Sequence, residues 1–359
     1  MTHRSYAALA AVLSLLAVPA VAGAATKTTY AGPPLTKPPK GVPTYPVDAT
    51  QFFPATTSVH VGDSVKWAFR GFHSIYFPKA GGKVAGLLTV DPARKYNDTD
   101  PAGAPYWFNG QTQFIASPAA AFPLGGKTEN GTKATGSGVP QSQKFTYKLK
   151  FTKAGSFTYF CTIHPNMKGT VRVLAKSRSV PSAKADKKTV AKQVTSAIAE
   201  IIKADKRADA AGNVIEAGRD SNKTSLLNFF PASKTVPVGS TVDFRMSSHT
   251  NEIHTITFGS DAVFAKKGYA EGLSAALLSP LPGTGTNGPP ELGMPGPVFF
   301  PSDPGALAFD GTQHGGFLNA GLLGEKPLPR DTKVTFPKAG TYNYICLVHP
   351  EMKGKIVVQ

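Results

Sequence analysis

The sequence predicts an all-β fold made of two tandem Greek-key β-sandwich domains that are joined by a partly helical linker. Three observations support this prediction: the chain repeats itself, apolar and polar residues alternate in short segments, and turn residues are abundant. Its 359 residues include 36 glycines, 31 prolines and 22 phenylalanines, which is typical of short strands separated by turns. A chain of this length, with 41% hydrophobic residues, suits about two domains.

The internal repeat consists of three sequence blocks that recur in the same order. The matched pairs are Phe52–Phe69 with Phe229–Phe244, His73–Pro78 with His254–Gly259, and Phe151–Gly169 with Phe336–Gly354. Because the order of the blocks is kept over most of each half, we expect two homologous domains. They are predicted at residues 45–175 and 224–359.

The third block illustrates how the strands are predicted. Apolar and polar residues alternate from Phe145 to Thr152, which is the period of a half-buried strand. An Ala-Gly turn follows, and the next strand, residues 156–160, ends immediately before Cys161. Several short strands punctuated in this way favour an antiparallel sandwich in each half.

Residues 1–25 have the pattern of a signal peptide. Arg4 supplies a positive charge, Tyr6–Val21 is apolar, and the small residues at 22–25 suit a signal peptidase. The apolar run is shorter than the roughly 20 residues that span a bilayer, so we expect cleavage rather than anchoring. The mature protein is therefore predicted to be exported, to the periplasm or to the extracellular side of the cell envelope.

Two segments lie outside the repeat. Residues 26–44 are proline-rich and predict an extended leader. Residues 176–223 are rich in basic residues and predict a linker. Within that linker, Lys184–Ala210 has few turn residues and places apolar side chains near one helical face. We therefore expect an amphipathic helix that packs on a domain.

The two cysteines occur in the same motif, Cys-x-x-His-Pro-x-Met-Lys-Gly, at Cys161 and Cys346. In an exported protein, two cysteines ordinarily suggest a disulfide. A disulfide, however, needs no histidine and methionine at matched offsets. Thiolate and thioether ligands select copper, and imidazole suits it too. We therefore predict copper ligation rather than a disulfide, with His73 and His254 placed at matching positions of the repeat to add one more imidazole to each site.

A strand histidine followed by Cys-x-x-His-x-x-Met resembles the type 1 (blue) copper or cupredoxin family. The loop spacing is similar to that of amicyanin, whereas plastocyanin has a longer gap between the histidine and the methionine. The resemblance covers most of both halves. It implies a Greek-key sandwich that holds copper near one end and carries one electron at a time. The ligands that it implies are His73, Cys161, His164 and Met167 in the first half and His254, Cys346, His349 and Met352 in the second.

The sequence departs from the family pattern in two ways. The interval from the strand histidine to the cysteine is longer than in small family members and contains Gly/Ala/Pro-rich insertions. Each insertion has a Phe-x-Gly motif, at Phe108 and Phe309. Ser74 and Thr255 follow the strand histidines, where the family often has an asparagine that helps to hold the loop.

The resemblance implies an exported electron-transfer protein whose two type 1 sites cycle between Cu(I) and Cu(II). The alternatives are a copper-dependent oxidoreductase, nitrite reductase-like or multicopper oxidase-like, and a copper storage or delivery protein. The catalytic copper of such enzymes needs His-x-His pairs or a histidine directly before the cysteine. Phe160 and Ile345 precede the cysteines, and no His-x-His pair occurs among the eight histidines. We therefore expect an electron carrier and not an enzyme.

The formal net charge of +17 is large for an exported protein. It favours acidic redox partner proteins or the anionic surface of a cell envelope. The lysines are scattered, and no basic-aromatic groove motif accompanies them. We therefore expect no nucleic acid among the partners.

Overall fold

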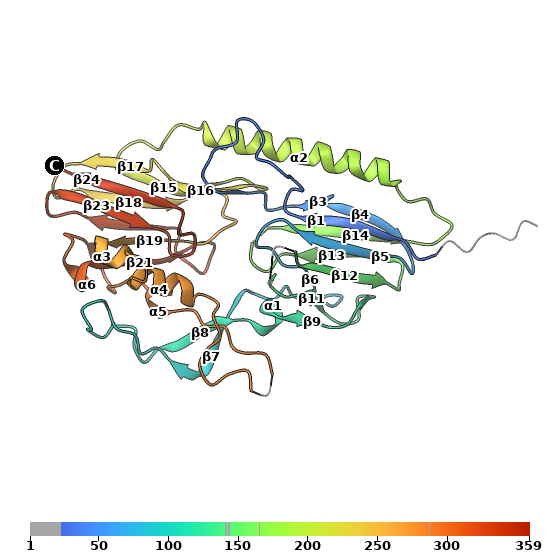
Figure 1. The fold of residues 1–359 in the computed structure, drawn as a ribbon, viewed down its shortest axis with the longest axis horizontal. Coiled ribbons are helices and arrows are strands. Elements are labelled where there is room, and N and C mark those ends of the chain that lie inside the picture. Colours follow the sequence, from blue (N-terminus) through green and yellow to red (C-terminus); the bar gives the residue numbers. More distant parts are fainter. Residues whose placement is uncertain (1–22, 141, 143, 165, 287) are drawn as a thin grey trace, which may run out of the picture.

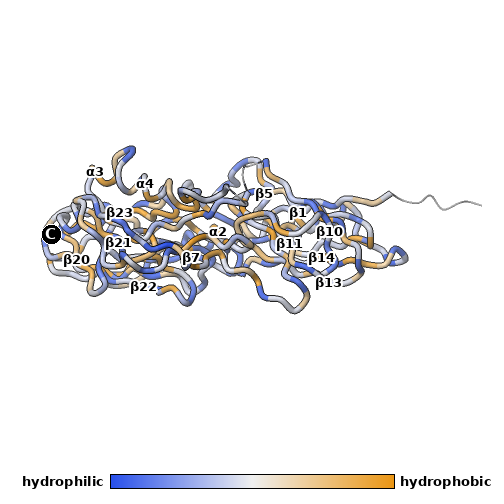
Figure 2. Tube along the Cα trace, turned by 90° about the horizontal axis from the view of Figure 1, so that it is seen from below, coloured by the Kyte–Doolittle hydropathy of each residue, from blue (hydrophilic) through white to orange (hydrophobic). Residues whose placement is uncertain are grey.

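The structure, a computed structural model, describes residues 23–140, 142, 144–164, 166–286 and 288–359. The predicted signal peptide at residues 1–25 lies outside the described residues except for its last three. The all-β prediction is confirmed, because four of the five sheets form two sandwiches that lie along the long axis of the molecule (Figure 1). Figure 2 shows the same elongated shape, with hydrophobic and hydrophilic residues interleaved along the strands.

The first sandwich packs a five-stranded sheet on a six-stranded sheet. The order of the five-stranded sheet is β10 (Thr128–Glu129), β12 (Thr146–Phe151), β5 (Ser64–Phe69), β1 (Thr26–Ala31) and β3 (Phe52–Phe53). The order of the six-stranded sheet is β4 (Thr56–His60), β14 (Lys168–Leu174), β13 (Gly155–Phe160), β6 (Tyr76–Phe77), β11 (Thr135–Ser137) and β9 (Pro123–Leu124). Trp67, Leu149 and Tyr159 are fully buried between the two sheets.

The second sandwich repeats this arrangement. Its six-stranded sheet has the order β2 (Val47–Asp48), β16 (Ser225–Phe230), β15 (Val214–Asp220), β18 (Thr241–Met246), β22 (Asp331–Thr335) and β20 (Leu307–Ala308). Its five-stranded sheet has the order β17 (Ser233–Val236), β24 (Lys353–Val358), β23 (Gly340–Ile345), β19 (His254–Gly259) and β21 (Phe317–Leu323). Phe244, Phe258 and Tyr344 fill its core.

The expectation of antiparallel sheets needs a correction. β1 runs parallel to β5 and β4 runs parallel to β14, and the pairs β15–β18 and β17–β24 repeat this in the second sandwich. Parallel neighbours need a connection of a dozen or more residues, and the long segments between these strands supply it. The alternation of side chains predicts each strand but not the direction of its neighbour.

Three strands fall outside the expected boundaries. β1 lies in the predicted leader but pairs with β3 and β5, since the prolines begin only after it. β15 lies in the predicted linker but pairs with β16 and β18. β2 belongs to the first half by sequence, yet it pairs with β16 in the second sandwich. The sheets therefore begin earlier than expected, and one short strand crosses between the halves.

The predicted linker helix is α2 (Ala183–Asp205), which begins after Ser182, whose hydroxyl accepts a hydrogen bond from the N–H of Ala185 at 3.3 Å. Side chains in this position satisfy a free N–H group of the first helical turn. Lys27 forms an ion pair with Asp186 in that turn at 2.7 Å. The helix is thus anchored to β1 near its start. No helix in the described residues is long and apolar enough to cross a membrane.

The helix packs on both sandwiches rather than on one domain (Figure 1). Val194 contacts a cluster that includes Phe53 of the first sandwich. About two turns further along the helix, Ile201 packs with Leu226 and Phe230 of the second sandwich. The apolar face of α2 therefore joins the two halves.

The insertions between the strand histidines and the cysteines contain the remaining elements: β7 (Leu88–Lys95), β8 (Thr112–Ala116), α1 (Pro118–Ala121), α3 (Asp261–Phe264), α4 (Tyr269–Ala276), α5 (Gly296–Phe299) and α6 (Gln313–Gly316). The hairpin of β7 and β8 belongs to the first half by sequence but lies beside α4 and α5 of the second (Figure 1). Tyr96 and Phe108 of this insertion are buried in one cluster with Val298, Phe317 and Leu347. The first insertion therefore covers the second sandwich.

Candidate metal centres

The first centre forms where β13 ends. The backbone N–H of Cys161 donates a hydrogen bond to the carbonyl of Met167 at 3.0 Å, and the N–H of Met167 donates to the carbonyl of His164 at 3.3 Å. These two bonds close the loop on itself. As a result, Cys161, His164 and Met167 are all buried within one turn of chain.

His73, in the segment before β6, completes this group. Its Nδ1 lies 3.0 Å from Nδ1 of His164, which in turn lies 3.5 Å from Sγ of Cys161. The ligand atoms of the three residues all lie within 4.8 Å of one another. Two imidazole nitrogens and a sulfur thus face one point. The side chain of His73 is fully buried there.

The second centre has the same construction. The N–H of Cys346 donates to the carbonyl of Met352 at 3.0 Å, and the N–H of Met352 donates to the carbonyl of His349 at 2.8 Å. Nδ1 of His254, at the start of β19, lies 3.2 Å from Nδ1 of His349. Sγ of Cys346 lies 3.7 Å from Nδ1 of His254 and 3.8 Å from Nδ1 of His349. The structure therefore brings together the predicted residues in both halves.

Hydroxyl groups of Ser74 and Thr255 hold the loops. The N–H of Thr162 donates to Oγ of Ser74, and the N–H of Leu347 donates to Oγ1 of Thr255, at 2.8 Å in both cases. The backbone N–H of Ser74 and that of Thr255 also point at the cysteine sulfur of their own centre, 3.4 Å away. Each hydroxyl thus joins the histidine segment to the cysteine loop.

The electrostatics of both centres favour thiolates. Burial would raise the pKa of the Cys161 thiol, but His164 and His73 hold it well below its usual range. Burial has the same effect on Cys346, and the two facing imidazoles again lower the pKa of its thiol. The thiolate is the form of cysteine that binds metals. Both thiols are free in the structure, and each lies beside two imidazoles of its own half.

The donor set fits copper. Two imidazole nitrogens and one thiolate, with a methionine nearby, form the ligand set of blue copper sites. Met167 packs in the same buried cluster as Cys161, and Met352 packs in the same cluster as Cys346. The fold therefore places the residues selected from the sequence close together, and their donor atoms are of the kinds that bind copper.

Sequence reasoning missed two carboxylates. Oε1 of Glu252 lies 3.2 Å from Nε2 of His164, and its Oε2 lies 3.7 Å from Nε2 of His349. Oδ1 of Asp48 lies 3.4 Å from Nε2 of His73. The one available signal was the acidic residue two positions before His254. Asp48 carries no such signal, because it lies far from every motif in the sequence.

Both carboxylates are held in their ionised form. Burial would raise the pKa of Glu252, but His164 and His349 lower it overall. At Asp48, burial would likewise raise the pKa of the carboxyl group, but the imidazole of His73 lowers it to about 2. Asp48 in turn raises the pKa of His73 to about 9 against the effect of burial. The outer nitrogens of His73, His164 and His349 are thus each matched to a negative charge.

A cavity of about 480 Å³ between the two sandwiches reaches both centres. His164, His349 and Glu252 line it together with apolar residues from both halves, among them Ile163 and Leu277. Ligand-sized molecules therefore have a path to the outer edges of two of the candidate ligands.

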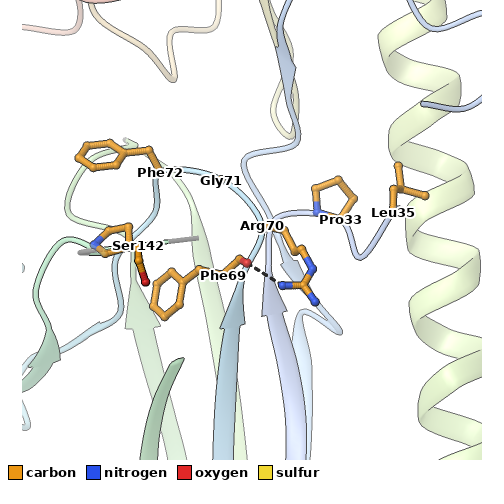
Figure 3. Close-up of a pocket in the computed structure, with 8 residues that line it drawn as sticks. Pro33, Leu35, Phe69, Arg70, Gly71, Phe72 and Ser142 are labelled. Carbon is orange, nitrogen blue, oxygen red and sulfur yellow. Dashed lines mark hydrogen bonds between the residues drawn. The ribbon is translucent and has the colours of Figure 1, made fainter. Parts of the chain in front are cut away.

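A second cavity, of about 720 Å³, lies beside the segment that precedes His73 (Figure 3). Phe69, Arg70 and Phe72 line it, and the guanidinium of Arg70 donates to the carbonyl of Phe69 at 2.9 Å. Phe72 is exposed at its rim. None of the candidate ligands lines this cavity, so it lies outside both centres.

Comparison with solved structures finds amicyanin and plastocyanin among the proteins to which this chain is similar. No family model matches it, and no curated protein matches it. A mutant of amicyanin in its reduced Cu(I) form is 19% identical, with a TM-score of 0.22, and the match covers 44% of this chain and 89% of amicyanin. Oxidised plastocyanin from Dryopteris crassirhizoma is 21% identical, with a TM-score of 0.21, and the match covers 41% of this chain and 99% of plastocyanin. Because these TM-scores are low, the description of the fold rests on the strand order given above. Each match covers less than half of this chain.

Proposed function

We propose that the protein is an exported electron carrier that binds copper at two type 1 sites. The observation that carries this proposal is the convergence of two imidazole Nδ1 atoms and a low-pKa thiol in each half. Met167 and Met352 are the proposed axial ligands. Bound copper would supply the one-electron chemistry, cycling between Cu(I) and Cu(II).

The residues of the chain contribute a fixed and dry environment. Hydrogen bonds within each loop, and the hydroxyl bonds from Ser74 and Thr255, hold the ligands before any metal binds. Because Cys161 and Cys346 are buried, water is kept from the thiolates. A site whose geometry is set by the protein needs little rearrangement when the charge of its metal changes, and this favours fast electron exchange.

The partners and the location follow from charge and from the leader sequence. The net charge of +17 supports acidic redox proteins as donors or acceptors, or association with an anionic envelope surface. The signal-peptide pattern supports export to the periplasm or the extracellular side. Nucleic acid is not among the proposed partners.

A copper-dependent oxidoreductase is the second candidate, and one observation favours it. Asp48, His164 and Glu252 place ligand atoms within 4.8 Å of one another, beside the cavity of about 480 Å³. Such a group could bind a further metal or a substrate next to both centres. Nitrite reduction and phenol oxidation by the copper-loaded protein distinguish the candidates: background rates support the carrier, and turnover near 10 per second, the median for enzymes, supports the oxidoreductase.

A metal count and an optical spectrum of the full chain test the main proposal. Two coppers per chain are expected, one for each His-Cys-His group, with an intense visible thiolate-to-copper band. Cys161→Ser and Cys346→Ser should each remove one copper and roughly half of the band, and the double variant should bind none tightly. A folded protein that binds copper without the visible band, or single variants that keep both coppers, would contradict the proposal.

A further inference from the structure

We propose that Glu252 is a positioning residue shared by the two metal centres, so that one carboxylate orients a histidine ligand in each half of the molecule. This inference rests on the proposed function, since it concerns how the two copper sites are held. It predicts that the two sites depend on each other through a residue that belongs to neither ligand set.

The geometry around Glu252 is two-sided. Its side chain is 6% exposed, and one oxygen faces Nε2 of His164 while the other faces Nε2 of His349. The Nδ1 atoms of the same two rings face their own cysteines, at 3.5 Å and 3.8 Å. Each ring therefore has its inner nitrogen at a candidate metal position and its outer nitrogen at the same carboxylate.

This arrangement selects one tautomer in both rings. A neutral imidazole that offers the lone pair of Nδ1 to a metal carries its proton on Nε2 and must donate that proton. A carboxylate accepts only, and its two oxygens can serve two donors at once. Carboxylates hydrogen-bonded to metal-binding histidines fix the orientation of the ring and strengthen it as a ligand. In this protein a single carboxylate, 3.2 Å from Nε2 of His164 and 3.7 Å from Nε2 of His349, is placed to take that role for two rings.

Asp48 provides the internal comparison. Its carboxylate lies 3.4 Å from Nε2 of His73 and within 4.8 Å of a ring nitrogen of His164. Both histidines belong to the first centre, so Asp48 serves that centre alone. Asp48→Asn should therefore weaken one centre, whereas Glu252→Ala should weaken both. Loss of such a partner typically lowers metal affinity by about 10- to 100-fold.

Glu252→Gln gives a sharper test, because glutamine keeps the size of the side chain but has one accepting oxygen and one donating NH₂. With copper at one centre only, the oxygen can serve that ring, and the unloaded ring can change its tautomer to accept from the NH₂. With copper at both centres, both rings must donate, and one of them faces the NH₂. The first copper should then bind nearly normally and the second about 10- to 100-fold more weakly.

The experiment is a titration of the full chain and its variants with Cu(I) against a competing chelator. Circular dichroism checks that each variant is folded. The Cu(I)-loaded protein also allows proton NMR of the ring N–H groups. These should exchange slowly with water when held by Glu252, since the side chains of His164 and His349 are only 5% and 19% exposed. The unaltered protein should show such signals for His164 and His349. Glu252→Ala should lose both signals, and Asp48→Asn should keep them.

The outcomes separate the inference from the proposed function. If the unaltered protein binds no copper tightly, the proposed function and this inference both fail. If it binds two coppers and Glu252→Ala leaves both affinities unchanged, the inference alone is wrong. A third equivalent that is lost with Glu252 would also overturn it, because Asp48, His164 and Glu252 would then hold a metal themselves.

Discussion

The two halves build the same centre in the same way but surround it differently. In both, the cysteine N–H reaches the methionine carbonyl at 3.0 Å, and a hydroxyl accepts from the residue after the cysteine at 2.8 Å. The outer nitrogen of His73 faces the ionised carboxylate of Asp48. Neither this nitrogen nor that of His254 has a hydrogen-bond partner among the described residues, and of the two only that of His73 has an ion-pair partner there. Local sequence therefore repeats the centre, while the packing of the halves sets its surroundings.

The insertions show the same difference on a larger scale. Phe108 and Phe309 occupy the same Phe-x-Gly motif, and both are buried. Phe108 stacks on Phe300 of the other half, with ring centroids 5.0 Å apart. Phe309 stays within its own sandwich, 5.5 Å from Phe258. A motif that repeats in sequence can thus join two halves in one copy and fill a core in the other.

Truncating these two phenylalanines should separate the roles. Phe108→Ala and Phe309→Ala should each lower the free energy of unfolding by about 3–5 kcal/mol, the usual cost of removing a buried ring. Only Phe108→Ala should free the β7–β8 hairpin from the second sandwich. Limited proteolysis within residues 88–116, with denaturant unfolding alongside, measures both effects. Equal protection of the hairpin in the two variants would contradict the difference drawn here.

The carboxylates beside the strand histidines should tune the two centres separately. Asp48→Asn removes a negative charge close to the first copper, so it should favour Cu(I) there and raise the reduction potential of that site. A tenfold change in the equilibrium corresponds to about 59 mV for one electron. Redox titration of the variant in a Cys346→Ser background reports the first site alone. A lower potential after the substitution would show that the charge argument is wrong.

Asp220→Asn is the matched change in the second half. Burial raises the pKa of Asp220 to about 6, although His254 acts to lower it. The carboxylate is therefore charged above pH 6, where the substitution should raise the potential of the second site, measured in a Cys161→Ser background. Below pH 6 the native carboxyl becomes protonated, and the reduction potentials of the second site in the variant and in the native protein should converge. A difference that grows on acidification would contradict the assignment.

The smallest effects are expected from the hydroxyls that hold the loops. Ser74→Ala leaves the buried N–H of Thr162 without its acceptor, and Thr255→Val does the same to Leu347. Each should cost about 1–3 kcal/mol and shift the visible band of its own centre only. Thermal unfolding and spectra of the single-site backgrounds measure this. Equal shifts at both centres after one substitution would show that the centres are coupled by more than Glu252.

Sequence alone predicted the elements whose evidence is local. Strands follow from alternating side chains, and Cys-x-x-His-x-x-Met places three candidate ligands in one loop whose hydrogen bonds span only a few residues. The helix of the linker was predicted within a few residues of α2 for the same reason. His73 and His254 were found because the repeat placed them at equivalent positions in the sequence, although His73 precedes β6 and His254 begins β19.

Only the tertiary structure decided the contacts between distant segments. β1 and β15 were assigned to a leader and a linker, because their strand character depends on pairing with neighbours far along the chain. Asp48 reaches His73, and Glu252 reaches His164, through the packing of two sandwiches on α2 and on the first insertion. No short-range pattern specifies such contacts, since their free energy comes from burying surfaces that meet only after both halves have folded.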